Sequence, residues 1–533
     1  EGENEDIGTG FTYDDAGNLT TMTDPEGNQT RFVAYDNMGN LLSMIDAANR
    51  QWTFDYDAAG RLVSQTNPLG NTTTYEYDGA NNRTAVINAL LKRFDFVYDD
   101  HNNMLRAIDP YEKTVTTTYN SDNLPTAVTD QEGKQTTAEY DNEGRLIQAI
   151  DGAENATAYT YDETTDTPGS SHLPVSIEYP TFTRYFTYDK MNRVIETTDD
   201  LGNGITHTTS REYDLAGRVT ASVDEEGNET TYEYDALSRL VKTTDALGNT
   251  VERTYDTLGN LIQVQDPNQG ITFFEYDKNN RLTKIIRPML EETAYEYDAL
   301  GNRTAMVDTK GQRIEYTYNA VNRLTQMVTY AASDHTTPVK TVAFDYDALG
   351  RITGYDDGTT SGSYAYDDLG RKTSETVDYG AFTKTLTTEY YANGLKSSFS
   401  LPDSDAVTYA YDENNRLVAV GIPGQGQITT TYDAEHWNRP ASVLRPGGSR
   451  VSYTYDPIMQ VTAMVAKDPA ENIVMSRSRE YSDAGTVTTV DTEHGQYTYQ
   501  YDSLYRLVEA DNPTLDDEAY TYDGLGNRLT SSK

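Results

Sequence analysis

The strongest constraint on this chain is an internal repeat that runs through almost its whole length. A tyrosine-aspartate pair comes twice in "YEYDALSRLVKTTDALGNTVERTYDTLGNLIQVQDP" (residues 232–267), each time followed by similar small residues and an alternating run. Units of this kind begin at 24 tyrosines, and 14 of the 23 intervals between them are 21 residues long. A fixed period predicts one stacked array rather than the several domains that 533 residues would otherwise suggest.

The residues behind each tyrosine predict a tight β-hairpin. The next residue is Asp in 20 units, and the residue four places after the tyrosine is Gly in 12 units and Asn in seven. Asp favours the first position of a type I turn, and Gly or Asn tolerates the positive φ of a three-residue loop with a G1 bulge. In that register Tyr234 pairs with Leu240, and Asp235 lies opposite Arg239.

A second loop of the same kind divides each unit. Examples are "DPEG" at residues 24–27, "NPLG" at 67–70 and "DALG" at 245–248. Between the loops, polar and apolar residues alternate, so that Tyr75 and Tyr77 share one face of a strand and Glu76 takes the other. Each unit therefore predicts two short strands and two reversals.

Together these features predict an all-β fold, a continuous antiparallel β-meander. Two strands for each of the 24 units make roughly 48 strands, and at ~4.8 Å per strand the ribbon is on the order of 230 Å long. Open twisted sheets rarely pass ~10 strands without curling. With 43 Tyr against 12 Phe and 2 Trp, the apolar face is too polar for a solid core. We expect the ribbon to coil into a spiral, as a hollow shell or tube.

The repeat divides the chain into three predicted parts. Residues 1–10 form a flanking segment of a longer chain, residues 11–328 a regular array, and residues 329–533 a less regular array that continues the same sheet. The spacing loosens at residues 162–186, 330–340, 438–451 and 466–480. Insertions in a repeat are expected in loops on one edge, either as tolerated variation in length or as a binding edge.

The charge narrows the choice of partners. The chain has 85 acidic residues against 42 Lys and Arg, a formal charge of −43 that is spread along its length. Such a surface repels nucleic acid and anionic lipid, and no apolar stretch approaches the ~20 residues of a membrane span. We expect neither nucleic-acid binding nor membrane insertion. The acidity suits either the solubility of a large sheet or a wall that faces a basic partner or cargo.

The sequence offers little for catalysis. It has no cysteine, and its six histidines (His101, His172, His207, His335, His436 and His494) lie far apart without metal-binding spacing. Almost every recurrent Asp already has a role in a turn. We therefore expect no catalytic residue, no metal and no cofactor, and the chain is predicted not to be an enzyme. The arginines that end the first loop of a unit, such as Arg61, Arg145, Arg239 and Arg281, are placed to stack on a neighbouring tyrosine.

The motif resembles that of a known family. "YDAAGRL" (residues 56–62), "YDNEGRL" (140–146) and "YDALGRI" (346–352) are similar to the YD repeat of RHS proteins, and the resemblance covers about residues 11–533. That family includes bacterial RHS polymorphic toxins, shell components of insecticidal toxin complexes, and teneurins. The resemblance implies a β ribbon that spirals into a hollow shell, which in the bacterial toxins encloses a C-terminal toxin released by self-cleavage. The core segment in which that cleavage takes place has no match here, so no protease aspartate is assigned.

We therefore predict a non-catalytic scaffold, a YD-repeat β shell that encloses a toxin or other protein cargo of a secreted bacterial protein, outside the cell or at its surface. The main alternative is an adhesive or fibre-forming protein that polymerises with copies of itself through open sheet edges; carbohydrate binding by exposed tyrosines is a third possibility. The residues predicted to define the repeat are Tyr56, Asp57, Gly60, Tyr140, Asp141, Gly144, Tyr234, Asp235, Tyr255, Asp256, Gly259, Tyr297, Asp298, Gly301, Tyr346, Asp347 and Gly350.

Overall fold

The computed structural model describes residues 8–162, 172–402, 404–436 and 438–532, and the regular elements within them are 48 β-strands. The strands are rich in Thr, Val and Tyr, the β-branched and aromatic residues that suit a half-buried pleated surface. None of the described residues forms a helix long and apolar enough to cross a membrane.

The first 24 strands are β1 (Gly10–Tyr13), β2 (Leu19–Thr23), β3 (Gln29–Tyr35), β4 (Leu41–Ile45), β5 (Gln51–Tyr56), β6 (Leu62–Thr66), β7 (Thr72–Tyr77), β8 (Arg83–Ile87), β9 (Arg93–Tyr98), β10 (Met104–Ile108), β11 (Thr114–Tyr119), β12 (Pro125–Thr129), β13 (Gln135–Tyr140), β14 (Leu146–Ile150), β15 (Ala156–Tyr161), β16 (Pro174–Glu178), β17 (Thr183–Tyr188), β18 (Val194–Asp200), β19 (Thr206–Tyr213), β20 (Val219–Val223), β21 (Glu229–Tyr234), β22 (Leu240–Thr244), β23 (Thr250–Tyr255) and β24 (Leu261–Gln265).

The remaining strands are β25 (Ile271–Tyr276), β26 (Leu282–Ile286), β27 (Glu292–Tyr297), β28 (Arg303–Val307), β29 (Arg313–Tyr318), β30 (Leu324–Ala331), β31 (Asp334–Tyr346), β32 (Ile352–Asp356), β33 (Ser361–Tyr366), β34 (Lys372–Asp378), β35 (Thr383–Tyr390), β36 (Lys396–Ser400), β37 (Ala406–Tyr411), β38 (Leu417–Ile422), β39 (Gly426–Tyr432), β40 (Pro440–Leu444), β41 (Arg450–Tyr455), β42 (Val461–Lys467), β43 (Ile473–Tyr481), β44 (Val487–Thr492), β45 (Gly495–Tyr501), β46 (Leu507–Asp511), β47 (Glu518–Tyr522) and β48 (Arg528–Ser532).

Each strand pairs antiparallel with the next strand in sequence, which confirms the predicted meander. In β21 and β22, Tyr234 pairs with Leu240, and the register shifts between Glu233 and Tyr234. The same bulge before the tyrosine recurs in the pairs β5–β6, β23–β24 and β45–β46. Because the strands alternate in direction, loops that follow a repeat tyrosine lie on one edge of the ribbon, here called the tyrosine edge. The other loops lie on the opposite edge.

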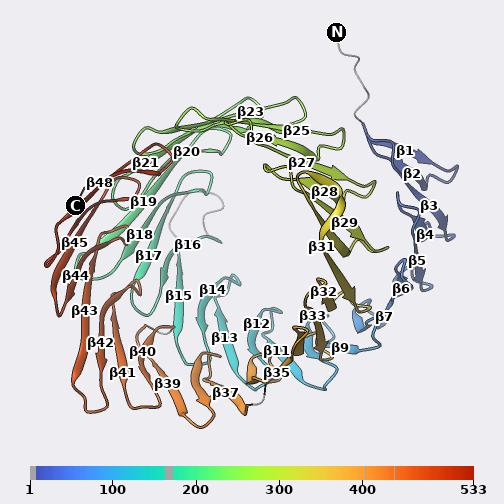
Figure 1. Ribbon diagram of the computed structural model, residues 1–533. Helices are drawn as coiled ribbons and strands as arrows, with labels where there is room; N and C mark the ends of the chain where they lie inside the picture. The colour runs from blue at the N-terminus through green and yellow to red at the C-terminus, as the bar shows by residue number, and fades with distance from the viewer. Residues whose placement is uncertain (1–7, 163–171, 403, 437, 533) are drawn as a thin grey trace.

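The ribbon coils about twice around a central space (Figure 1). We name strands β1–β24 the first coil and strands β25–β48 the second coil. The two coils lie against each other along their edges, so that residues 252 to 285 positions apart come into contact. The spiral predicted from the length of the ribbon is confirmed, and the sheet does not close on itself, because β1 and β48 are not paired with each other.

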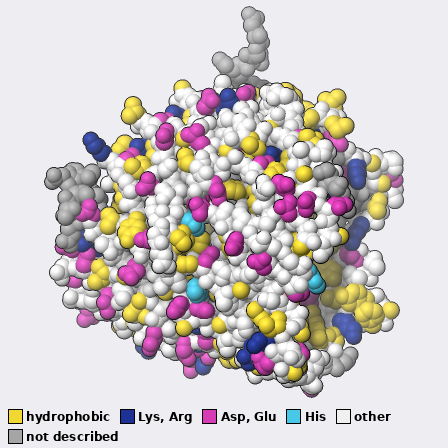
Figure 2. Space-filling model, turned by 90° about the vertical axis from the view of Figure 1, so that its left-hand side faces the viewer, with side chains coloured by type: hydrophobic (Ala, Val, Ile, Leu, Met, Phe, Trp, Pro, Cys, Tyr) yellow, Lys and Arg dark blue, Asp and Glu magenta, His cyan; other side chains and the backbone are white. Residues whose placement is uncertain are grey.

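The wall has little conventional core. The buried apolar residues among those described are Ala85, Ala221, Ala305, Ala419 and Val451, and no large side chain is fully buried. The repeat tyrosines are mostly half-buried. Figure 2 shows acidic side chains scattered over one face of the molecule, with fewer basic ones among them. Backbone pairing and side-chain contacts between neighbouring strands therefore hold the wall together.

The insertions behave differently from the simple expectation of longer loops. Residues 330–340 lengthen two paired strands, since β31 has 13 residues and pairs with β30 over most of its extra length. Residues 466–480 likewise lengthen β42 and β43. Near residues 438–451 the extra residues lie in the loop between β39 and β40, where the amide of Asp433 donates to the carbonyl of Arg439. Part of the stretch 162–186 lies outside the described residues.

Candidate functional site

Each tyrosine-edge loop is closed by its own aspartate. In the loop at residues 235–239, the amides of Leu237 and Arg239 both donate to Oδ1 of Asp235, at 2.9 Å each. Nε of Arg239 donates to the other carboxylate oxygen, Oδ2, at 2.6 Å. Ser238 takes the left-handed position, with a φ of 66°. The predicted Asp–Arg pairing and loop type are confirmed in this unit.

The same arginine also ties one unit to the next. The guanidinium of Arg239 lies 4.8 Å from the centre of the Tyr255 ring, and its Nη1 donates to the carbonyl of Asp256 at 2.8 Å. The Tyr255 hydroxyl in turn donates to the carbonyl of Leu240 at 2.9 Å. Stacking of Arg61, Arg145 and Arg281 on the next repeat tyrosine follows the same geometry, as predicted. The tyrosine edge therefore carries a ladder of cation–π and charge-assisted hydrogen bonds.

The residues predicted to define the repeat all lie on this tyrosine edge. Each tyrosine is the last residue of its strand, each aspartate opens a loop, and the glycines have φ between 79° and 94°. Tyr234, Asp235, Tyr255 and Asp256 come together in one ladder, whereas the units at residues 56, 140, 297 and 346 lie elsewhere around the wall. They form a recurring structural element and do not converge on a pocket.

The sequence did not show where the two coils touch each other. We call this line of contact the seam. There, opposite-edge loops of the first coil meet tyrosine-edge loops of the second coil. Nδ2 of Asn279 donates to Oδ2 of Asp24 at 2.7 Å, and Nδ2 of Asn414 donates to Oδ2 of Asp151 at 2.6 Å. The guanidinium of Arg50 donates to the carbonyl of Asn319 at 2.7 Å. Carboxylates and amides of one coil thus bind the other coil around the ring.

In places the seam brings backbone against backbone. A Cβ atom added to Gly152 would stand 2.3 Å from the carbonyl oxygen of Glu413 in the second coil. The amide of Ala153 donates to Oδ1 of Asn414 at 2.8 Å beside it. Neither Gly152 nor Gly524, which lies against Pro267, has a positive φ, so close approach rather than loop conformation explains them. Glycine at this loop position does not by itself indicate contact, because Gly79 holds the same position with nothing within 4 Å of an added Cβ.

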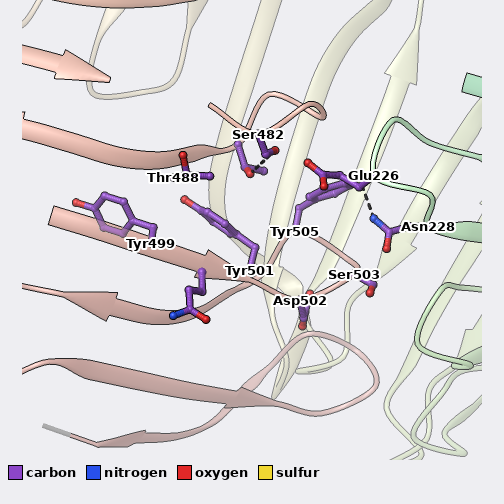
Figure 3. Close-up of a pocket in the computed structure, with 11 residues that line it drawn as sticks. Glu226, Asn228, Ser482, Thr488, Tyr499, Tyr501, Asp502, Ser503 and Tyr505 are labelled. Atoms are coloured by element: carbon purple, nitrogen blue, oxygen red, sulfur yellow. Dashed lines mark hydrogen bonds between the residues drawn. The ribbon is translucent and has the colours of Figure 1, made fainter. Parts of the chain in front are cut away.

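A cavity of about 320 Å³ opens at the seam (Figure 3). Glu226 and Asn228 reach it from the first coil, and Ser482, Tyr499, Tyr501 and Tyr505 from the second. Figure 3 shows Tyr501 in the middle of the group, with Tyr499 on one side and Tyr505 and Glu226 on the other.

Tyr505 fastens the coils together beside this cavity. Its hydroxyl donates to Oδ2 of Asp224 at 2.6 Å and accepts from Nδ2 of Asn228 at 3.2 Å. Burial, and then the bond to the Asp224 carboxylate, raise the pKa of Tyr505 to about 12. The phenol therefore stays protonated at neutral pH and acts as a hydrogen-bond donor.

Comparison with known proteins agrees with this architecture. The RHS Repeat family matches residues 13–55, 56–90 and 119–156, and the Teneurin YD-shell family matches residues 173–301 and 291–434. Together these matches cover more than half of the chain. The chain belongs to the YD-repeat (RHS) family. No curated protein sequence matches it.

Solved structures show the same fold as this YD-repeat chain. A crystal structure of TcdB2-TccC3-Cdc42 has a TM-score of 0.69 at 13% identity, over 99% of this chain and 37% of that chain. The Photorhabdus luminescens Tc holotoxin pore with the mutation TccC3-D651A has a TM-score of 0.62 at 13% identity, over 98% of this chain and 33% of that chain. This chain thus spans about a third of the length of these proteins. The likeness establishes the β-shell fold.

Proposed function

We propose that this chain is part of the wall of a hollow β shell that encloses and shields a toxin or other protein cargo of a secreted bacterial protein. The observation that carries the proposal is the seam, because it joins two coils of one ribbon into a continuous wall around a central space. Such a wall separates its contents from proteases and solvent without any bond chemistry. The chain therefore acts as a container rather than as an enzyme.

The physical basis of containment is the number of contacts that opening would break. Within a coil, each inner strand is hydrogen-bonded on both sides, so a single strand cannot swing away without losing two ladders. Between coils, carboxylates and amides bind in loops that are themselves fixed by their aspartates. The wall is consequently a cooperative unit, with its weakest line along the seam.

The solved relatives support a protein partner. One of them is named for TcdB2, TccC3 and a further protein, Cdc42, and another is named as a holotoxin pore. By analogy, the cargo or partner of this chain is a protein, and its place of action is outside the producing cell. Cargo identity, assembly and secretion belong to the proposal, since the chain covers only 37% of the first of these relatives.

A second candidate function is a fibre built from copies of this chain. Among the described residues, β1 pairs with β2 alone and β48 with β47 alone, so each of these strands has one unpaired edge. Unpaired edges can accept a strand of another molecule. A head-to-tail contact of this kind produces an open filament when the rotation does not close.

The test is electron microscopy of the unstained natural full-length protein at low concentration, combined with limited proteolysis. A shell predicts closed particles with density inside, and a cargo that resists protease for as long as the particle is intact. Filaments with a repeat set by this chain would replace the shell with the fibre. Containment would be contradicted by closed particles without internal density in which the protease rapidly cleaves every part of the protein outside the wall.

A further inference from the structure

The regular repeat contains a built-in site for a guanidinium group. In the units whose five-residue first loop ends with arginine, the guanidinium lies over the next repeat tyrosine, as with Arg193 over Tyr213 at 4.5 Å and Arg416 over Tyr432 at 4.4 Å. Below it the loop aspartate accepts from Nε, and the carbonyl after the tyrosine accepts from Nη1. We call this position the arginine slot.

Several units have no arginine in this slot, and in one of them, in the second coil, the slot residues line a cavity. In the loop at residues 482–486, Ser482 stands where most other units have aspartate and Thr486 where most have arginine or asparagine. The two hydroxyl oxygens lie 2.9 Å apart, within hydrogen-bond distance of each other, in place of the Asp–Arg pair. Among the described residues, no Lys or Arg lies over the ring of Tyr501, the tyrosine that the slot would cover.

The cavity at the seam occupies this empty slot. Ser482, Thr486, Tyr501 and Asp502 all line it, and they are the equivalents of Asp235, Arg239, Tyr255 and Asp256 in a regular unit. The cavity therefore arises from two substitutions in the repeat.

The first coil supplies the charge that Ser482 no longer provides. Glu226 lines the cavity, and within the described part of the chain its carboxylate accepts one long hydrogen bond, of 3.4 Å, from the amide of Ala484. Asp502 is already paired with Arg506 at 2.7 Å, so Glu226 is the carboxylate available to a ligand. Its exposed position leaves the cavity open to an entering side chain.

We propose that this vacant slot binds the guanidinium of an arginine side chain from a basic protein partner. The partner's guanidinium would lie on the Tyr501 ring, donate to the carbonyl of Asp502 and pair with Glu226, which reproduces in trans the contact that other units make in cis. No Lys or Arg lines the cavity, which disfavours anions, and its polar side chains disfavour lipid. The formal charge of −43 attracts basic partners. The site does not depend on whether the wall encloses a cargo.

The experiment is saturation-transfer difference NMR on the whole chain, with N-acetyl-L-argininamide as the probe. Its neutral isostere N-acetyl-L-citrullinamide and the sugar methyl glucoside serve as comparison ligands. We expect the argininamide to bind about tenfold more tightly than the citrulline compound, because only a cation gains from the tyrosine ring and Glu226. Glu226→Gln should reduce that preference severalfold.

The decisive variant restores an aspartate and an arginine to the slot. The double change Ser482→Asp with Thr486→Arg restores the regular loop, so it should fold, raise the thermal midpoint and abolish argininamide binding. Thr254→Arg adds a positive charge at an exposed strand position and should leave binding unchanged. Argininamide binding that survives the double change would overturn the proposal, as would equal binding of the citrulline compound or preferential binding of the sugar.

Discussion

Two loops with nearly the same sequence behave differently in the two coils. Residues 235–239 read Asp-Ala-Leu-Ser-Arg and residues 347–351 read Asp-Ala-Leu-Gly-Arg, and both close in the same way on their aspartate. Yet Leu237 of the first coil is 69% exposed, whereas Leu349 of the second coil is half-buried. Because the local structure is the same, the difference comes from the neighbouring coil, which covers the tyrosine edge of the second coil only.

The opposite edges show the reverse arrangement. In the first coil, whose opposite edge lies in the seam, most of these loops share one hydrogen-bond pattern, as at Asp24 and Asp130. In the second coil that edge is free, and many of its loops differ from the pattern. Seam contact thus accompanies regular loops on the opposite edge of the first coil and a half-buried Leu349 on the tyrosine edge of the second, which defines where substitutions should matter.

Acid should produce the largest effect. The hydrogen bond from Asn527 is the main cause that lowers the pKa of Asp523 to about 2; burial opposes it, and Asn268 across the seam adds to it. A carboxyl whose folded pKa lies below its unfolded value of about 3.9 contributes stability that is present above that pH and is lost as the pH falls through the folded pKa. Since many loop aspartates share this direction, the free energy of unfolding in urea should fall steeply from pH 4 to pH 2.

A matched pair tests whether the seam contributes to that acid response. Asp14 and Asp523 both open Asp-x-x-Gly-Asn loops, but only Asp523 accepts a hydrogen bond from the other coil. Changing either to Asn preserves the loop, as the natural Asn120 and Asn319 show. Asp523→Asn should flatten the pH dependence more than Asp14→Asn. Equal slopes for the two variants would mean that the seam adds nothing to the acid response.

Gly152→Ala should have the next largest effect. The added Cβ would meet the backbone oxygen of Glu413 at 2.3 Å, which neither coil can relieve by a rotamer change. We expect a loss of about 3 kcal/mol, the upper end of ordinary overpacking, measured by denaturant unfolding. Gly79 holds the same place in a free loop with nothing within 4 Å, so Gly79→Ala should change stability by less than about 0.5 kcal/mol. A tolerated Gly152→Ala would mean that the coils are not in contact there.

The two leucines allow a smaller test of the same comparison. Leu349→Ala removes a half-buried side chain and should cost about 1 kcal/mol. Leu237→Ala, in the matching exposed loop, should cost less than about 0.5 kcal/mol. Thermal midpoints of the two variants, measured side by side, check the difference. Equal losses would show that the neighbouring coil does not cover the tyrosine edge of the second coil.

The sequence predicted what depends on nearby residues. The Tyr234–Leu240 register, the Asp235–Arg239 pair and the stacking of Arg61 on Tyr77 follow from turn chemistry, and the structure confirms them. The roughly 48 strands followed from counting units. The proposed division near residue 328 stays a prediction.

The seam could not be predicted, because it depends on the circumference of a coil. That circumference accumulates from small twists over many strands, and contacts between residues 252 to 285 positions apart leave no periodic signal. Asp151 and Asn414 belong to ordinary loop patterns, and nothing in either loop identifies the other as its partner. The arginine slot at Thr486 became visible only when the ring of Tyr501 and Glu226 of the other coil were seen together.

The smallest net effect is expected at Tyr505, where two terms oppose each other. Its φ of 60° is a left-handed conformation that costs a bulky residue about 1–2 kcal/mol, while its bond to Asp224 is of the charged type that contributes about 1.5–3 kcal/mol. Tyr505→Gly removes both, so its stability at pH 7 should change by less than about 1 kcal/mol, whereas Tyr505→Phe keeps the strain and should lose more.

Because the pKa of Tyr505 is raised to about 12, its contribution is present below pH 10 and is lost as the pH rises through 12. The free energy of unfolding of the unaltered chain should therefore fall between pH 10 and pH 12, and both variants should show a smaller fall. An equal fall in the variants and in the unaltered chain would show that the Tyr505 phenol does not hold the two coils together.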